Sequence, residues 1–183
     1  MTEIIRLTLV SHAMTDAMAA GRFPTDEPLN RIGRRQLKAA ARLDVSTGVR
    51  QFTGPEERAR ETAQLLGLHA ATEPRLADLG CGAWCGQTLR ALGPAELETW
   101  LTDPTRAPHG GESLVDLIDR VGGWLESLTH DTSPTVAVTH PAVIRAAILG
   151  ALGMPPKSFW RIDIAPASRT VLHFRKGLWT LRL

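Results

Sequence analysis

Two histidines stand at the ends of predicted buried strands. His12 follows the apolar run at residues 2–10, and His140 follows the run at 135–139. Carboxyl ends of parallel strands line the ligand crevice of an α/β sheet, so we expect both imidazoles to face one pocket. Histidine serves there as nucleophile or as proton donor and acceptor. A single histidine is more often structural, but two at matching strand ends favour a functional site.

Strands and helices alternate along the chain, as apolar spacing indicates. A loop is expected between the first strand and residue 29, and another over residues 69–92. Strands are predicted at 2–10, 49–52 and 135–139, with two or three more among 162–164, 170–174 and 178–183; helices are predicted at 29–43, 55–66, 94–101, 111–128 and 141–152. This alternation predicts an α/β fold, a three-layer αβα sandwich with a mostly parallel central sheet, in a single domain spanning residues 1–183.

Composition excludes several classes of protein. The chain has 183 residues, of which 43% are hydrophobic and 22% charged, so an intrinsically disordered chain is excluded. No apolar run approaches the roughly 20 residues that a membrane span needs, and no basic segment precedes the first apolar run. We therefore expect a cytoplasmic protein with no membrane partner.

Metal and nucleic-acid binding are not expected either. Cys81 and Cys85 form half of a zinc-type pair, but no second pair accompanies them. The helix predicted at 29–43 has a basic face, yet the net charge of the chain is only +2. A solvated helix face explains this basic stripe better than nucleic acid does.

Several segments carry a family resemblance, in matching order and spacing. They are Leu7-Thr8-Leu9-Val10-Ser11-His12-Ala13-Met14-Thr15, Pro28-Leu29-Asn30-Arg31-Ile32-Gly33-Arg34-Arg35-Gln36, Arg58-Ala59-Arg60-Glu61-Thr62-Ala63, Leu76-Ala77-Asp78 with Gly82-Ala83-Trp84-Cys85-Gly86, Gly110-Gly111-Glu112-Ser113, and Val138-Thr139-His140-Pro141-Ala142-Val143-Ile144-Arg145. Together they resemble the histidine phosphatase superfamily, which has the phosphoglycerate mutase-like fold.

The resemblance implies phosphoryl transfer through a phosphohistidine, without metal or other cofactor. His12 then attacks phosphorus, and Arg58 with a protonated His140 stabilises the charge on the phosphoryl oxygens. Asp78, one methylene shorter than the family's usual glutamate, protonates the leaving oxygen and later activates water. The residues expected to bind phosphate are Ser11, Thr15, Arg58 and His140.

The chain also departs from the family pattern. Ser11 stands in place of an arginine, Ala13 and Pro141 in place of glycines, Met18 in place of an asparagine, and Gly54 in place of a serine. Loss of one preorganised donor commonly costs about 10²–10³ in rate. Two hypotheses therefore stay open: a small phosphatase, or a degenerate member that binds an anionic ligand or a protein partner with little turnover.

We favour the phosphatase, because a chain drifting from catalysis has little need to keep these four catalytic groups together. A mutase is less favoured, since the chain is short. A serine hydrolase is excluded, because Ser11 and its neighbour His12 would point to opposite faces of a strand and no G-x-S-x-G segment exists. The expected partner is a small phosphorylated substrate. The apolar tail with Trp160 and Trp179 is a candidate homodimer surface.

Overall fold

The central feature of the fold is one mixed sheet. A computed structural model describes residues 4–40, 43 and 45–183, and in them six strands follow the order β3-β2-β4-β1-β5-β6. The first four of that order are mutually parallel, whereas β5 is antiparallel to β1 and β6 is antiparallel to β5. The bounds are Ile5–Ser11 for β1, Arg50–Thr53 for β2, Ala71–Thr72 for β3, Thr135–Thr139 for β4, Arg169–Arg175 for β5 and Leu178–Arg182 for β6.

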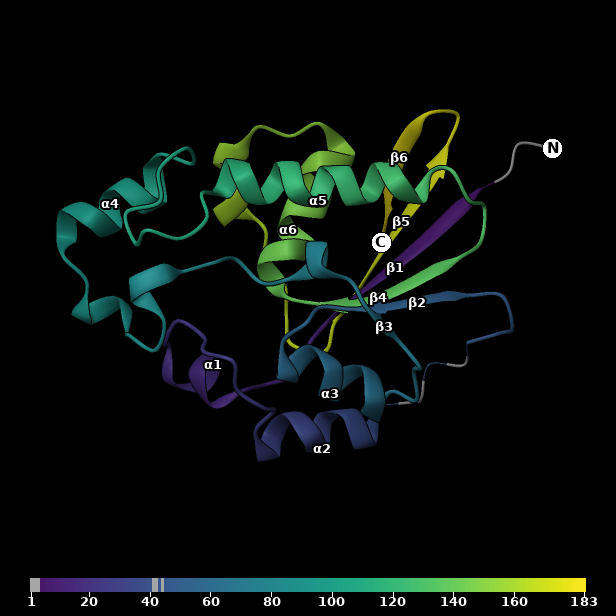
Figure 1. The fold of residues 1–183 in the computed structure, drawn as a ribbon, viewed down its shortest axis with the longest axis horizontal. Helices are drawn as coiled ribbons and strands as arrows, with labels where there is room; N and C mark the ends of the chain where they lie inside the picture. Colours follow the sequence, from purple (N-terminus) through teal and green to yellow (C-terminus); the bar gives the residue numbers. More distant parts are fainter. Residues whose placement is uncertain (1–3, 41–42, 44) are drawn as a thin grey trace.

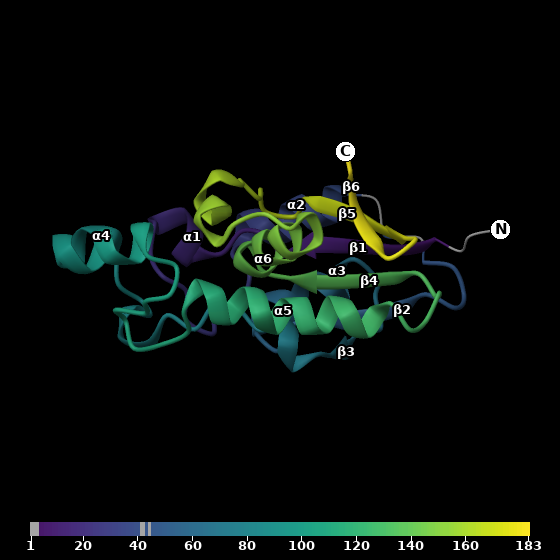
Figure 2. The ribbon, with the colours of Figure 1, turned by 90° about the horizontal axis from the view of Figure 1, so that it is seen from above.

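Helices cover both faces of this sheet, which gives the three expected layers (Figures 1 and 2). Helices α5 and α6 pack together on one face, and α2 and α3 lie on the other. Helices α1 and α4 lie beyond the carboxyl ends of β1 and β4 (Figure 1). The bounds are Asp16–Ala20 for α1, Arg31–Ala39 for α2, Glu57–Leu65 for α3, Pro94–Thr102 for α4, Leu114–Leu128 for α5 and Pro141–Leu152 for α6.

Two hydrophobic clusters hold the layers together, one on each face of the sheet. Leu7 and Leu9 of β1 belong to the cluster under α5 and α6, whereas Val10 belongs to the cluster over α2 and α3. On β4, Ala137 packs into the first cluster and Val138 into the second. Side chains alternate between the faces of a strand, so a continuous apolar run indicates burial on both sides. This burial fixes the two strands that precede the histidines.

The α/β class and the mostly parallel sheet are confirmed, and most element bounds agree within a few residues. Strand β1 starts at Ile5, while residues 2–3 of the expected strand lie outside the described residues. The helix expected at 29–43 is α2, which ends at Ala39; residues 41 and 42 are likewise outside them. Helix α5 starts at Leu114, because Ser113 caps it by accepting a hydrogen bond from the Asp116 N–H.

The tail forms two of the two or three strands expected there, and two other expectations were wrong. Residues 162–164 do not form a strand: the Ile162 carbonyl accepts a hydrogen bond from Arg145 Nε at 2.7 Å, and Ile164 packs into the core. The loop expected before residue 29 contains the short helix α1, capped by Thr15. Residues 69–92 contain strand β3 and three short 3-10 turns. No helix in the described part of the chain is long and apolar enough to span a membrane.

Candidate active site

The carboxyl ends of β1 and β4 bring His12 and His140 together. Ser11 pairs with Thr139 in the parallel register, and the His12 N–H donates to the Thr139 carbonyl at 2.9 Å. The two imidazole rings then lie edge to face, with centroids 5.2 Å apart and planes at 63°. Their expected meeting at one edge of the sheet is confirmed.

The backbone around His12 sets the protonation of its ring. Nδ1 lies 2.8 Å from the Ala13 carbonyl oxygen, which can only accept, so Nδ1 carries the hydrogen of the neutral ring. Burial and the charge of His140 lower the pKa of His12 from 6.5 to about 3. His12 is therefore a neutral imidazole at physiological pH, and its lone pair lies on Nε2. A nucleophilic imidazole requires this form.

A buried ion pair lies beside His12. Arg58, on α3, donates from Nη2 to Asp78 Oδ2 at 2.6 Å and from Nη1 to the Thr25 carbonyl at 2.8 Å. Its Nε is buried and has no hydrogen-bond partner within the described residues. Burial opposes ionisation of Asp78, but the charges of His140 and Arg58 outweigh it and hold the pKa of Asp78 below its ordinary value. Asp78 is thus a carboxylate in the free protein.

Glu56 is a site residue that sequence reasoning missed. Its Oε2 lies 2.7 Å from His140 Nε2, and its Oε1 accepts a hydrogen bond from the Asp78 backbone N–H at 3.0 Å. Burial opposes ionisation of Glu56, yet the hydrogen bond and charge of His140 outweigh it and lower the pKa of Glu56. In the sequence Glu56 is only an acid at the start of a helix, which the helix dipole already explains. No local signal connects it with His140, 84 residues away.

Gly54 makes room for this contact. A Cβ at residue 54 would lie 2.7 Å from the Leu76 carbonyl oxygen and 2.9 Å from His140 Nε2. It would also lie 3.2 Å from Glu56 Oε2. The glycine that replaces the family's serine therefore has a steric reason, because any side chain there would collide with the pair of His140 and Glu56.

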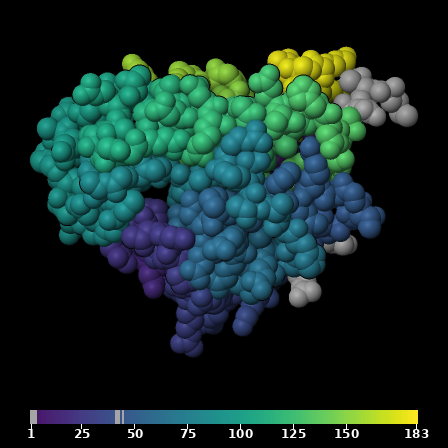
Figure 3. All heavy atoms as spheres, in the orientation of Figure 1, coloured from purple at the N-terminus to yellow at the C-terminus, as the bar shows by residue number. Residues whose placement is uncertain are grey.

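A cavity of about 180 Å³ opens next to these groups. Of the six residues predicted for the site, it is lined by His12, Thr15, Arg58 and Asp78. In the space-filling view a hollow lies between the α1 segment, in purple, and the α4 region, in teal (Figure 3). The cavity receives lining residues from both elements, among them Met18 and Trp100.

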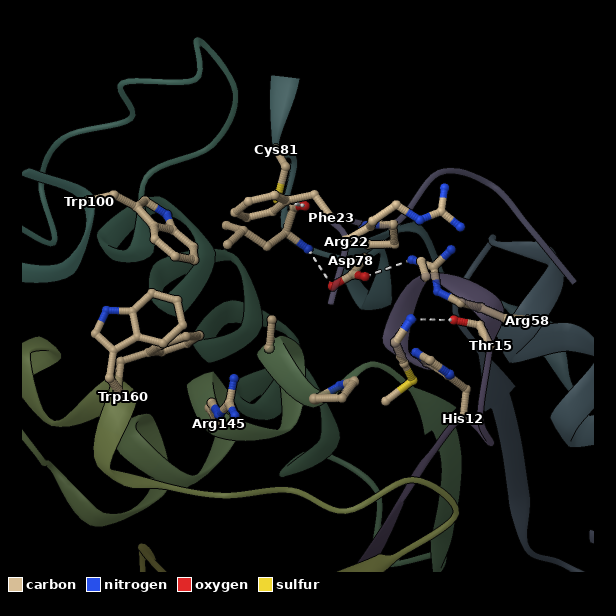
Figure 4. A pocket seen from close by; sticks show the side chains of 17 residues that line it. His12, Thr15, Arg22, Phe23, Arg58, Asp78, Cys81, Trp100, Arg145 and Trp160 are labelled. Atoms are coloured by element: carbon tan, nitrogen blue, oxygen red, sulfur yellow. Dashed lines mark hydrogen bonds and ion pairs between the residues drawn. The ribbon is translucent and has the colours of Figure 1, made fainter. Parts of the chain in front are cut away.

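The other two predicted residues lie behind the cavity wall. His140 is fully buried and reaches the site through Asp78 and Glu56. Ser11 is also fully buried, with its hydroxyl 3.5 Å from the His12 carbonyl, so the structure does not bring it to the cavity. Thr15 Oγ1 accepts a hydrogen bond from the Met18 N–H at 3.2 Å (Figure 4).

The far side of the cavity is aromatic. Its lining there includes Phe23, Trp100, Phe159 and Trp160, with Arg145 close by (Figure 4). Cys81 also lines the cavity, and burial raises the pKa of its thiol to about 12. Across the described residues, no group of three or more His, Cys, Asp or Glu side chains is placed to hold a metal ion. Independence from metal stays a prediction.

Comparison with known proteins gives the family. The profile of the histidine phosphatase superfamily (branch 1) matches residues 7–183. The chain belongs to this superfamily. Phosphoserine phosphatase 1 of Hydrogenobacter thermophilus is 28% identical over an alignment of 191 positions. The alignment covers 94% of this chain and 88% of the relative. The glucosyl-3-phosphoglycerate phosphatase of Mycolicibacterium vanbaalenii is 32% identical over 179 residues, which cover 84% of this chain and 76% of the relative.

Solved structures agree with this membership of the histidine phosphatase superfamily. A mycobacterial glucosyl-3-phosphoglycerate phosphatase in complex with VO3 superposes with a TM-score of 0.84 at 29% identity, covering 98% of both chains. The phosphoglycerate mutase-like fold is thereby confirmed, and the comparisons support a small phosphatase. They do not favour the alternative of a degenerate, non-catalytic member.

Proposed function

We propose that this protein hydrolyses a phosphomonoester through a phosphohistidine at His12, without a metal ion. One observation carries the proposal. The neutral His12, with its lone pair on Nε2, lies beside two buried nitrogens whose hydrogen bonding is incomplete. Arg58 Nε has no partner in the described chain, and His140 Nδ1 has only a 3.5 Å contact with Asp78 Oδ2. Buried donors are normally paired, so these two call for an acceptor supplied by a ligand. Phosphoryl oxygens next to a nucleophile meet that need.

Asp78 occupies the position of an oxyanion in the free protein. Its Oδ2 lies 2.6 Å from Arg58 Nη2 and 3.5 Å from His140 Nδ1. A dianionic phosphoryl group competes for the same two cations and displaces this carboxylate oxygen. The displaced Asp78 loses the charges that hold its pKa down and takes up a proton.

The first chemical step then follows from these positions. His12 Nε2 forms a bond to phosphorus while the bond from phosphorus to the leaving oxygen breaks. The protonated Asp78 gives its proton to that oxygen, so the alcohol leaves neutral. The Thr15 hydroxyl, which already accepts from Met18 N–H, keeps its own hydrogen for a phosphoryl oxygen.

In the second step the Asp78 carboxylate acts as a general base. It removes a proton from water as the water oxygen attacks phosphorus, and the bond from phosphorus to Nε2 breaks. Inorganic phosphate leaves, and Asp78 returns its proton to solvent. Glu56 has a positioning role, because its carboxylate lies 2.7 Å from His140 Nε2 and orients that ring.

Trapping the intermediate tests the proposal. The protein is mixed with 4-nitrophenyl phosphate, quenched in alkali, which preserves phosphohistidine, and analysed by peptide mass spectrometry. We expect phosphate on His12, its loss in His12→Gln, and its retention in the exposed control His69→Gln. Release of 4-nitrophenol with no dependence on His12, or no release and no phosphoenzyme at all, would refute the proposal.

The relatives supply the first natural substrates to assay. Phosphoserine and glucosyl-3-phosphoglycerate are the substrates named for them. If His12 is never phosphorylated but phosphate or vanadate binds, the non-catalytic alternative would replace the phosphatase.

A further inference from the structure

The aromatic part of the cavity is built from three separate segments. Phe23 follows α1, Trp100 lies on α4, and Phe159 and Trp160 lie in the 3-10 segment Pro156–Arg161. Trp100 packs against Trp160 at 4.4 Å between ring centroids and against Phe23 at 5.4 Å, and Phe159 lies 4.8 Å from Trp160. We refer to these four residues as the aromatic wall. Neighbouring rings meet at 58° to 81° between their planes, so the rings hold one another in place and the wall presents an uneven aromatic surface.

Arg145 is the cation beside this wall. It projects from α6, lies half-buried, and places its guanidinium carbon 5.7 Å from the centre of the Phe159 ring and 5.9 Å from that of Trp160. Its Nε donates to the Ile162 carbonyl, but no ion pair of the described residues includes Arg145. Asp163 and Asp78 act on this guanidinium only without direct contact, and a partly desolvated cation with no directly paired anion is costly. The guanidinium therefore has donors to offer to a ligand in the cavity.

The lining is poorly suited to phosphoserine, the substrate named for one relative. The hydrogens of the ammonium group of that substrate need acceptors such as a carboxylate or several carbonyl oxygens, although aromatic faces also attract a cation. Asp78 is the single acidic residue among the described residues that line the cavity, and Arg58 already engages it. An ammonium group facing the aromatic wall near Arg145 would meet a like charge instead.

We propose, on the basis of the phosphatase function above, that the substrate is a phosphomonoester whose leaving group carries one aromatic ring with an anionic substituent. The ring stacks against the aromatic wall, and the substituent binds Arg145. The cavity of about 180 Å³ contains both the catalytic end at His12 and Arg58 and the aromatic wall, so the space left beside a phosphoryl group favours one ring over a larger ring system. Offset and edge-to-face contacts with the four rings favour an aromatic ring over an alkyl chain.

Matched substrates test this without any difference in leaving-group basicity. Propyl phosphate, 3-phenylpropyl phosphate and 3-(4-carboxyphenyl)propyl phosphate all release a primary alkanol. We expect kcat/KM to rise about 10- to 100-fold from the first to the second, since a single methylene in an apolar pocket is already worth about 10-fold or more. The carboxylate should add about 10-fold, as a charge-assisted contact with Arg145 provides. Phosphoserine should be turned over no faster than propyl phosphate.

Two variants locate the effect, each with a matched control. Trp160→Leu should reduce the preference for phenylpropyl over propyl phosphate by about 10-fold, whereas Trp179→Leu, which removes an indole from the β5–β6 hairpin, should not. Arg145→Met should abolish the carboxylate's advantage and leave the phenyl preference. Its control Arg161→Met removes an exposed charge outside the cavity lining.

The outcomes separate this proposal from the proposed function. Hydrolysis of all three substrates at equal rates, or faster hydrolysis of phosphoserine, would overturn the aromatic assignment and leave the phosphatase standing. If none of the substrates is hydrolysed, titration calorimetry with 3-phenylpropylphosphonate and propylphosphonate measures whether the cavity prefers an aromatic ring. Tighter binding of the phenyl compound that depends on Trp160 supports the aromatic site without catalysis, and equal or absent binding overturns it.

Discussion

A neutral His12 has a measurable consequence for the acid stability of the fold. In the unfolded chain this imidazole takes up a proton near pH 6.5, whereas in the folded protein its pKa is lowered to about 3. Between these values only the unfolded chain binds the proton, so the free energy of unfolding falls as the pH falls. The stabilisation is complete above pH 6.5 and is lost progressively toward pH 3.

The size of the effect follows from the two pKa values. A full pH unit inside the window is worth about 1.36 kcal/mol, and the onset near pH 6.5 is gradual. Lowering the pH from 6.5 to 4.5 should therefore cost the wild-type protein about 2 kcal/mol through His12 alone. The variant His12→Asn, which cannot take up a proton, should lack this loss. The exposed control His69→Asn should keep it.

Two measurements check the reasoning. Urea unfolding of the three proteins at pH 6.5 and 4.5 gives the difference in unfolding free energy. Nitrogen-15 spectra of the histidine side chains report His12 directly, and we expect a hydrogen on Nδ1 and none on Nε2 from pH 7 to pH 4. A His12 that titrates near pH 6.5, or equal acid losses in wild type and His12→Asn, would refute the neutral nucleophile.

Substitutions at three further residues probe the groups around His12. Glu56→Gln should lower kcat about 10- to 100-fold, because His140 loses the carboxylate that orients its ring. Glu56→Asp, which keeps a carboxylate, should restore part of the rate in steady-state assays. Asp78→Asn should leave the rate of His12 phosphorylation by 4-nitrophenyl phosphate unchanged, but should lower the rate of alkyl phosphate hydrolysis about 10²–10⁴-fold. Equal rate losses for the two substrate types would show that Asp78 is structural. Gly54→Ser should lower the unfolding free energy by about 1–3 kcal/mol, because its side chain overpacks against His140. The control Gly123→Ala lies in open space on α5 and should not lower it. Calorimetric melting of both variants measures the difference.

Long-range placement of the histidines could be predicted from the sequence because it depends on strong local signals. The continuous apolar runs before His12 and His140 are typical of strands buried on both faces, and parallel strands end at one edge. Short elements lacked such signals. Helix α1 has five residues, too few to show a helical period, and strand β3 has two. The apolar residues 162–164 looked like a strand because packing in a core and packing in a sheet require the same residue types.

The charges around the site could be predicted only in part. Arg58 and Asp78 follow from the family resemblance, but their direct contact depends on how α3 meets the segment after Leu76. The contact of Glu56 with His140 requires the absence of a side chain at Gly54, a condition that is visible only in three dimensions. Sequence reasoning therefore identified the groups but not the pairing between them.

That pairing bears on what the missing arginine at Ser11 means for the site. The carboxylates of Asp78 and Glu56 face Arg58 and His140, so the cations beside His12 are already largely neutralised in the free protein. In the proposed mechanism, a phosphoryl group binds mainly by replacing the Asp78 carboxylate and gains little from surplus positive charge. Under this balance, affinity and selectivity must come from the other end of the substrate. The aromatic wall and Arg145 lie there, and we infer that recognition of the leaving group compensates for weaker recognition of the phosphate.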